Sequence, residues 1–262
     1  DAAVMGQIFA APSPDLSYAA ATAVNGGAGV LFLYNNYAGD RLNFDMAAEM
    51  ARAEGIDVRT VLVWDDVASG PPDQPQLRRG TAADVFVIHV AGAAAESGAS
   101  IDEVVRLTEK ARDNCRSIGV ALSSCTLPAT GKSTFEIADD EMEVGMGLHG
   151  EPGVQRTSLR SADETAAMML PLLLNDLPFR RGDVVNLLIN GYGSTTLMEM
   201  YIMNRAFHRL LAAEGITVHR SEIGNFCTTQ EMAGCSLTLM RLDDELIRLD
   251  DTPANCPAYT RF

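Results

Sequence analysis

Short apolar runs alternate along the chain with segments whose apolar residues recur at helical spacing. GVLFLYN (29–35), VRTVLVW (58–64) and VFVIHVAG (85–92) are apolar runs of the length of a strand. Helical spacing follows in LNFDMAAEMARAEG (42–55), which stops at a glycine, and in IDEVVRLTEKARDNC (101–115). Because buried strands give such runs and amphipathic helices give such spacing, the pattern predicts strands that alternate with helices.

The alternation resumes in the second half of the chain. Three more runs predict strands and one longer segment predicts a helix, in the order GVALS (119–123), DVVNLLINGYG (183–193), LMEMYIMNRAFHRLLAAEG (197–215, the helix) and ITVHRSEIG (216–224). We therefore expect an α/β fold of two α/β lobes with largely parallel sheets covered by helices. A helix ends near Ser117 and a Ser/Thr/Pro/Gly-rich stretch soon follows, so the predicted domains are residues 1–117 and residues 118–262.

Composition and charge exclude several classes of protein. The chain has 262 residues, 47% of them hydrophobic, which is enough for a substantial core. Its net charge of −15 argues against a nucleic-acid surface, because phosphates would be repelled. No apolar run reaches the ~18 residues that a membrane span needs. The five cysteines are scattered without a C-x-x-C pair or a secretory signal, which is typical of reduced thiols in a cytoplasmic protein.

Two kinds of segment resemble binding sites, one for phosphate and one for a metal ion, but neither is interpreted as such a site. PATGKST (128–134) ends like a phosphate-binding loop, but Thr126 stands where the first glycine of that motif is required. We therefore interpret it as a polar surface loop. The acidic stretches DDEMEV (139–144) and RLDDEL (241–246) are interpreted as solvated faces and helix starts, so no metal site is predicted.

Two glycine-rich stretches carry the candidate chemistry. EVGMGLHGEPG (143–153) surrounds His149 with four glycines, and a neutral imidazole is a nucleophile and a hydrogen-bonding partner near physiological pH. NNYAGDRLNFDMA (35–47) places Asp40 between a strand and a helix, where open α/β sheets bind ligands. The alternative interpretations are an ordinary loop histidine and a helix cap. A third turn, INGYGSTTLMEMY (189–201), could contact a ligand or could need its glycines only for the turn.

Several motifs together resemble the ketose-binding K subunit or domain of dihydroxyacetone kinases. They are, in chain order, NYAGDRLNFDMAAEMA, AGAAAE, GVALSSCTLPATGK, DDEMEVGMGLHGEPGV, NGYGSTTLMEMY and EMAGCSLTLMRLDDEL. The resemblance implies that His149 bonds covalently to the carbonyl carbon of the ketose as a hemiaminal. It also implies that Asp40 is the acid/base beside the transferred hydroxyl, and that Asn35, Gly39 and Gly147 are substrate-binding residues.

The chain departs from the family pattern at two places. The family commonly reads Lys-Asn-Tyr-Thr-Gly-Asp, whereas Asn35 stands in place of the lysine and Ala38 in place of the threonine. Since that lysine helps to hold a substrate hydroxyl, its absence leaves the identity of the sugar open, and a four-carbon ketose such as erythrulose is an alternative to dihydroxyacetone. The family's Gly-Ser-Gly-His-Glu-Pro segment is absent after Asp1, and we expect it to precede Asp1 in a longer polypeptide.

The resemblance also implies a division of labour between two components. We expect this chain to bind no cofactor, and ATP or ADP with Mg²⁺ to be carried by a helical L-type subunit or domain. In the phosphotransferase-system version, phospho-relay proteins recharge the bound ADP. A homodimer is expected. The alternatives are a noncatalytic regulatory paralogue that binds dihydroxyacetone, and a general small-ligand-binding protein that forms no covalent adduct. His89, in a predicted strand, and His208 and His219 are expected to be dispensable.

Overall fold

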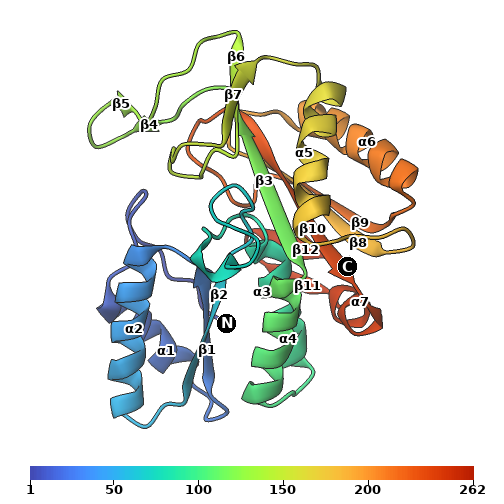
Figure 1. The fold of residues 1–262 in the computed structure, drawn as a ribbon. Coiled ribbons are helices and arrows are strands. Elements are labelled where there is room, and N and C mark those ends of the chain that lie inside the picture. Colours follow the sequence, from blue (N-terminus) through green and yellow to red (C-terminus); the bar gives the residue numbers. More distant parts are fainter.

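The fold of all 262 residues, seen in a computed structural model, is a mixed arrangement of helices and sheets (Figure 1). The helices are α1 (Pro14–Val24), α2 (Ala38–Ala53), the short 3₁₀ helix η1 (Pro75–Leu77), α3 (Asp84–Glu96), α4 (Ile101–Asp113), α5 (Ala162–Asp176), α6 (Leu197–Glu214) and α7 (Asp244–Asp250). The strands are β1 (Val30–Asn35), β2 (Val58–Val63), β3 (Cys115–Ala121), β4 (Thr126–Leu127), β5 (Lys132–Ser133), β6 (Glu141–Val144), β7 (Gln155–Ser158), β8 (Val184–Gly191), β9 (Thr217–Gly224), β10 (Gly234–Leu242), β11 (Ala254–Cys256) and β12 (Tyr259–Arg261). The α/β class predicted from the sequence is confirmed.

The first lobe is built on the parallel pair of strands β1 and β2. Their side chains alternate between two apolar layers, because successive residues of a strand point to opposite faces. Val30 and Phe32 pack with α1 and α2, whereas Leu31 and Leu33 face the layer that contains α3 and α4. Figure 1 shows β1 and β2 between these two pairs of helices.

The larger sheet is mixed, and in this respect the expectation of largely parallel sheets needs correction. Its strand order is β7-β6-β3-β10-β8-β9, and only the β8–β9 pair is parallel. The other pairs are antiparallel because β10 enters between β3 and β8, while β6 and β7 extend the far edge as a hairpin. The chain passes from β9 to β10 through a loop. Parallel neighbours need a longer crossover connection, usually a helix, and no helix lies between these two strands.

Helices cover both faces of this sheet. Leu187 and Ile189 of β8 pack into the apolar layer under α5 and α6, while Leu188 faces the layer shared with α3, α4 and α7. β3 is buried along its whole length, as expected for a strand with packed layers on both sides.

The segment at 85–92 is helical, so the strand predicted there is wrong. It belongs to α3, and its buried residues Phe86, Val87, Val90 and Ala94 recur at the spacing of one helix face. A continuous apolar run is consistent with either a strand or a buried helix, and length decides between them. Here the run continues through AGAAAE to form a helix of 13 residues.

The two lobes share one apolar layer. Residue 117, where the predicted domain boundary lies, falls inside β3. The Val67 amide donates to the Ser117 carbonyl at 3.0 Å, and the Ser117 amide donates to the Asp65 carbonyl at 2.8 Å. The chain after β2 is therefore joined to the central sheet, and the division into domains 1–117 and 118–262 stays a prediction.

Local sequence signals explain where several elements begin. α6 starts with a capping box between Thr196 and Glu199 and ends at Gly215, which has a left-handed conformation. α2 begins at Ala38, earlier than predicted, so that Asp40 lies in its first turn. None of the helices is both long enough and apolar enough to cross a membrane.

The segments set aside in the sequence are also accounted for. PATGKST forms the exposed turn between β4 and β5 together with β5 itself, with no helix behind it, in agreement with a polar surface segment. Asp243 caps α7 by accepting from the Leu246 amide at 3.0 Å, so RLDDEL is a helix start. DDEMEV differs from a solvated face, because Glu143 is 7% exposed and pairs with Arg156 at 2.7 Å.

Candidate functional site

Three loops bring the candidate residues together where the two lobes meet. The loop after β1 leads into α2, whose first turn carries Asp40, and the segment after β2 runs from residue 64 to residue 83 and contains η1. The third loop, between β6 and β7, carries His149. Since β1 and β2 are parallel, their carboxyl ends open toward the same edge, which is where α/β sheets usually bind ligands.

Glu151 holds the imidazole of His149. One carboxylate oxygen lies 3.0 Å from His149 Nδ1, and the other accepts from the His149 backbone amide at 2.9 Å. Burial acts to raise the pKa of Glu151, but the hydrogen bonds from His149 and from the backbone outweigh it and lower the pKa to about 2. A carboxylate at this position favours the tautomer with hydrogen on Nδ1, which leaves the Nε2 lone pair free.

Two aromatic rings flank the imidazole. Phe9 and Tyr37 each meet the ring of His149 edge to face, with centroids 5.0 and 4.8 Å away. The Tyr37 hydroxyl is buried without a hydrogen-bonding partner, and burial raises the pKa of Tyr37 well above its usual value. A neutral hydroxyl without a partner is available to a ligand that supplies an oxygen.

Asp40 lies within electrostatic reach of His149. Burial raises the pKa of this carboxyl above its ordinary value, and a charge on His149 acts in the opposite direction. The two predicted catalytic residues are thus brought to one site, although they are more than one hundred residues apart in the sequence.

Asn35 is tied to α3. Its side-chain amide donates to Asp84 at 3.3 Å, and its carbonyl oxygen is buried without a partner. Burial raises the pKa of Asp84 to about 7, and the neighbouring Asp65 carboxylate adds to the effect. The second oxygen of Asp84 also lacks a partner. Two unpaired polar atoms therefore lie at the position where the family pattern has a lysine.

The two predicted substrate-binding glycines differ in how strictly the structure requires them. A Cβ atom on Gly147 would lie 2.5 Å from Arg79 Nη1 and closer still to the Glu151 carboxylate, so any larger residue would have to displace these two side chains. A Cβ on Gly39 would make only an ordinary contact of 3.5 Å with Ala11. In the third glycine-rich turn, Tyr192 is buried in the core and Gly193 has a φ of +128°, so the turn itself accounts for these residues.

The other three histidines have structural partners. His89 Nε2 lies 3.0 Å from the Asp250 carbonyl, and His208 Nε2 lies 2.7 Å from the Ser221 hydroxyl. His219 comes together with Asp250 and Asp251 in a group that could ligate a metal ion. Arg220 pairs with both of these carboxylates and Arg261 with Asp250, so guanidinium groups already supply the positive charge there.

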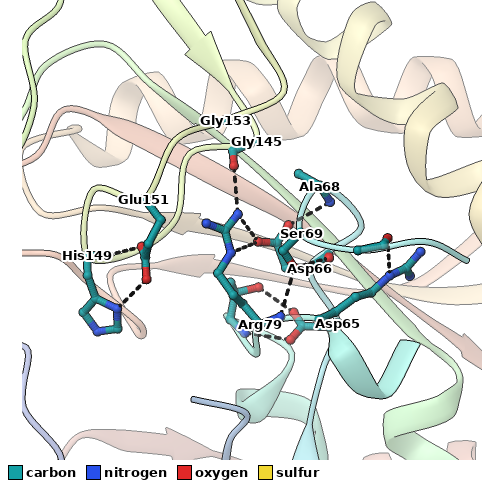
Figure 2. A network of polar contacts seen from close by, with 12 residues as sticks. Asp65, Asp66, Ala68, Ser69, Arg79, Gly145, His149, Glu151 and Gly153 are labelled. Atoms are coloured by element: carbon teal, nitrogen blue, oxygen red, sulfur yellow. Dashed lines mark hydrogen bonds and ion pairs between the residues drawn. The ribbon is translucent and has the colours of Figure 1, made fainter. Parts of the chain in front are cut away.

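Figure 2 shows the polar network behind the histidine, with Glu151 between the His149 ring and Arg79. Arg79 donates from Nε to Asp66 at 2.9 Å and from Nη2 to the Gly145 carbonyl at 3.1 Å. Sequence reasoning missed Glu151, Tyr37 and Arg79. The first lies within the motif that contains His149, and the second within the motif that contains Asp40. Nothing local in the sequence links Arg79 to either motif.

Comparison with known proteins gives matches over almost the whole chain. The Dak1 domain matches residues 1–258. The dihydroxyacetone-binding subunit DhaK of PTS-dependent dihydroxyacetone kinase 2 from Listeria innocua is 47% identical over 259 residues, which cover 99% of this chain and 78% of that protein. The L-erythrulose 1-kinase of Mycolicibacterium smegmatis is 43% identical, over 98% of this chain and 46% of its own length.

Solved structures agree with these matches. A dihydroxyacetone kinase operon co-activator, DhaQ, superposes with a TM-score of 0.86 at 32% identity, covering 92% of this chain and 75% of its own. The dihydroxyacetone kinase of C. freundii in complex with AMP-PNP and Mg²⁺ superposes with a TM-score of 0.82 at 34% identity, covering 93% of this chain and 44% of its own.

Proposed function

We propose the following function for this chain, which belongs to the Dak1 domain family. It is the ketose-binding component of a dihydroxyacetone kinase, and it holds a short-chain ketose through His149 while a terminal hydroxyl is phosphorylated. The observation that carries the proposal is the His149 imidazole, whose Nδ1 is held by Glu151 while Tyr37 and Asp40 lie around the ring.

Formation of the adduct needs one bond to form and one proton to move. The lone pair on His149 Nε2 attacks the ketose carbonyl carbon, and the π electrons of the carbonyl pass to its oxygen. That oxygen takes up a proton, and the ring gives up the Nδ1 proton that Glu151 accepts and returns to solvent. The product is a neutral hemiaminal, and the Glu151 carboxylate stabilises the positive charge that develops on the ring during the attack.

A covalent tether suits so small a ligand. Dihydroxyacetone has few atoms, and noncovalent contacts supply only a limited binding energy per atom. The tether also excludes glycerol, which has no carbonyl group. Asp40 then acts as the base that accepts the proton of the terminal hydroxyl as it attacks the phosphoryl donor, and its raised pKa brings it closer to the operating pH.

The phosphoryl donor belongs to a second component in this proposal. A helical L-type subunit or domain carries ATP or ADP with Mg²⁺, and this chain presents the hydroxyl to it. The C. freundii kinase in complex with AMP-PNP and Mg²⁺ supports the use of a nucleotide, and its chain is more than twice as long as the segment matched. The chain would work as a homodimer.

The preferred sugar is a three- or four-carbon ketose. Relatives of this chain include both dihydroxyacetone-binding subunits and erythrulose kinases. Asn35, in place of the family's lysine, offers an unpaired carbonyl oxygen beside the unpaired Asp84 oxygen. Hydrogen-bonding groups of this kind suit an additional hydroxyl, so erythrulose is included among the substrates.

A regulatory function is the second candidate, because the DhaQ co-activator superposes on this chain over 92% of its length. A regulator of this kind would bind dihydroxyacetone through His149 but support no turnover. The two functions therefore differ in turnover and not in adduct formation.

A coupled kinase assay with a helical L-type partner tests the proposal. Purified chain and partner are supplied with dihydroxyacetone or erythrulose, and with either ATP or phospho-relay proteins. We expect ketose phosphate to form in the complete mixture, and none to form with the His149→Ala variant. Adduct formation without turnover under every donor condition would favour the regulatory function. Ketose that binds equally well to the His149→Ala variant would contradict both functions.

A further inference from the structure

Arg79 is the charged side chain that connects the loop after β2 to the loop of His149. Its Nε and Nη2 pair with Asp66, and Nη2 also donates to the Gly145 carbonyl. The third nitrogen, Nη1, makes no hydrogen bond and points to the space over Gly147, where the Glu151 carboxylate also lies. These two groups are within about 5 Å of each other, where opposite charges interact appreciably.

The backbone on both sides of Arg79 is held firmly. The Arg79 amide donates to the Ser69 hydroxyl at 2.9 Å, and the Asp66 amide donates to the Arg79 carbonyl at 3.2 Å. Asp66 also accepts from the Ala68 amide at 3.0 Å. The guanidinium is 15% exposed and Asp66 is 4% exposed, so the pair is weakly screened by solvent. The cation is therefore fixed in place rather than mobile on the surface.

We propose that Arg79 is a positioning residue that aligns the His149 imidazole for attack on the ketose and opposes its conversion to the imidazolium. It anchors the glycine-rich loop through the Gly145 carbonyl and offsets the charge of Glu151. Glu151 alone would favour the imidazolium form, which has no lone pair on Nε2 and is not a nucleophile. The inference rests on the proposed function, because it assigns Arg79 to the reaction of His149.

The charged and titratable groups around the ring come from three elements. Glu151 lies on the same loop, Asp40 and Tyr37 lie at the start of α2, and the Asp66–Arg79 pair lies on the loop after β2. Glu151, Asp40 and Asp66 favour the imidazolium, and Arg79 opposes them. Tyr37 stays neutral at ordinary pH, because burial raises its pKa.

The experiment measures the protonation of the ring directly, without ketose. The protein is labelled with ¹⁵N-histidine, the His149 ring signals are assigned with the His149→Ala variant, and the titration midpoint is followed by NMR. We expect Arg79→Met to move the midpoint upward by about 0.5 to 1 pH unit, and Asp66→Asn to move it downward. Arg79→Lys, which keeps the charge, should restore most of the native midpoint.

Arg78 provides a matched control. It is the neighbouring arginine, it is 1% exposed, and it pairs with Asp176 at the end of α5 through two hydrogen bonds of 2.8 and 2.5 Å. Arg78→Met should lower the melting temperature and leave the His149 midpoint unchanged. If Arg79→Met does not fold, Arg79→Gln replaces it, and the ring midpoint should again move upward.

A second readout separates this inference from the proposed function. With ketose labelled at the carbonyl carbon, the pH at which half of the adduct forms should move upward in Arg79→Met in parallel with the ring midpoint. A native chain that forms no adduct would overturn the proposed function, while the ring titration would still report on Arg79. An unchanged or lowered ring midpoint in Arg79→Met, or an equal shift in Arg78→Met, would overturn the assignment of Arg79.

Discussion

Replacing Glu151 with Gln tests how the histidine is held. The amide keeps the size of the side chain and one acceptor for Nδ1, but it loses the charge and the acceptor for the His149 backbone amide. Although burial acts to raise the pKa of Glu151, its hydrogen bonds lower it from 4.5 to about 2, and a change of that size corresponds to roughly 3 kcal/mol.

Solvent reduces this energy, because the Glu151 side chain is 32% exposed. An effective value of about 1 to 2 kcal/mol remains after screening. The neutral hemiaminal has no proton on Nδ1, so this energy acts while positive charge develops on the ring, and Glu151→Gln should slow adduct formation by roughly 5- to 30-fold. The same variant should move the titration of the His149 ring downward, opposite in direction to Arg79→Met, because it removes a negative charge beside the ring.

The time course of the reaction with ¹³C-carbonyl-labelled dihydroxyacetone measures the effect, since adduct formation replaces a carbonyl signal by that of a tetrahedral carbon. Glu143→Gln is a matched control, because Glu143 accepts from the Gly153 amide at 2.8 Å at the end of the same loop without touching the ring. Glu143→Gln should change the stability of the fold more than it changes adduct formation. A native rate of adduct formation and an unmoved ring titration in Glu151→Gln would refute the role given to the carboxylate.

Three further changes test other parts of the molecule. Asp40→Asn should leave the adduct on His149 intact but lower turnover with the L-type partner by ~10²–10⁴-fold, and normal turnover would reduce Asp40 to a helix residue. The folded-state pKa of Asp84 is raised to about 7, so this group favours folding most below pH 4 and its contribution is lost as the pH rises toward 7. The melting temperature of Asp84→Asn should therefore vary less between pH 4 and pH 7 than that of the native chain. Some pH dependence should remain, because burial also raises the pKa of Asp66 to about 6. Identical pH profiles for the two proteins would contradict this. Leu187→Ala, at a fully buried position of β8, should lower the free energy of unfolding by about 2–5 kcal/mol in denaturant titrations.

The strands and helices with clear ends could be predicted from the sequence, whereas their pairing could not. α6 is bounded by a capping box and a glycine, and both signals are local. The insertion of β10 between β3 and β8 depends on contacts between residues more than one hundred positions apart in the case of β3, and no local signal reports them. At 85–92 the local signal was ambiguous, because Phe86 to Val90 are apolar without interruption except for His89.

The site was only partly accessible from the sequence for a similar reason. His149 and Asp40 stand in motifs that a family resemblance identifies, but the role of each depends on neighbours from other elements. Glu151 is two residues from His149, and only the fold of the glycine-rich loop shows that its carboxylate turns back onto the ring. Arg79 lies far from both motifs and reaches the loop only when β2 and β6 are in place.

The late entry of β10 has a consequence for how the chain folds during synthesis. β3 is complete at residue 121, yet one of its two neighbours in the sheet is not made until residues 234–242 leave the ribosome. β8 waits for the same strand along one edge. Until then two apolar strands have unpaired edges, which is the state in which chains pair with the wrong partner. Refolding of this chain should therefore be slow, because β3 and β8 cannot complete their pairing before β10 inserts between them. It should also depend on protein concentration, because the unpaired strand edges can pair with another chain.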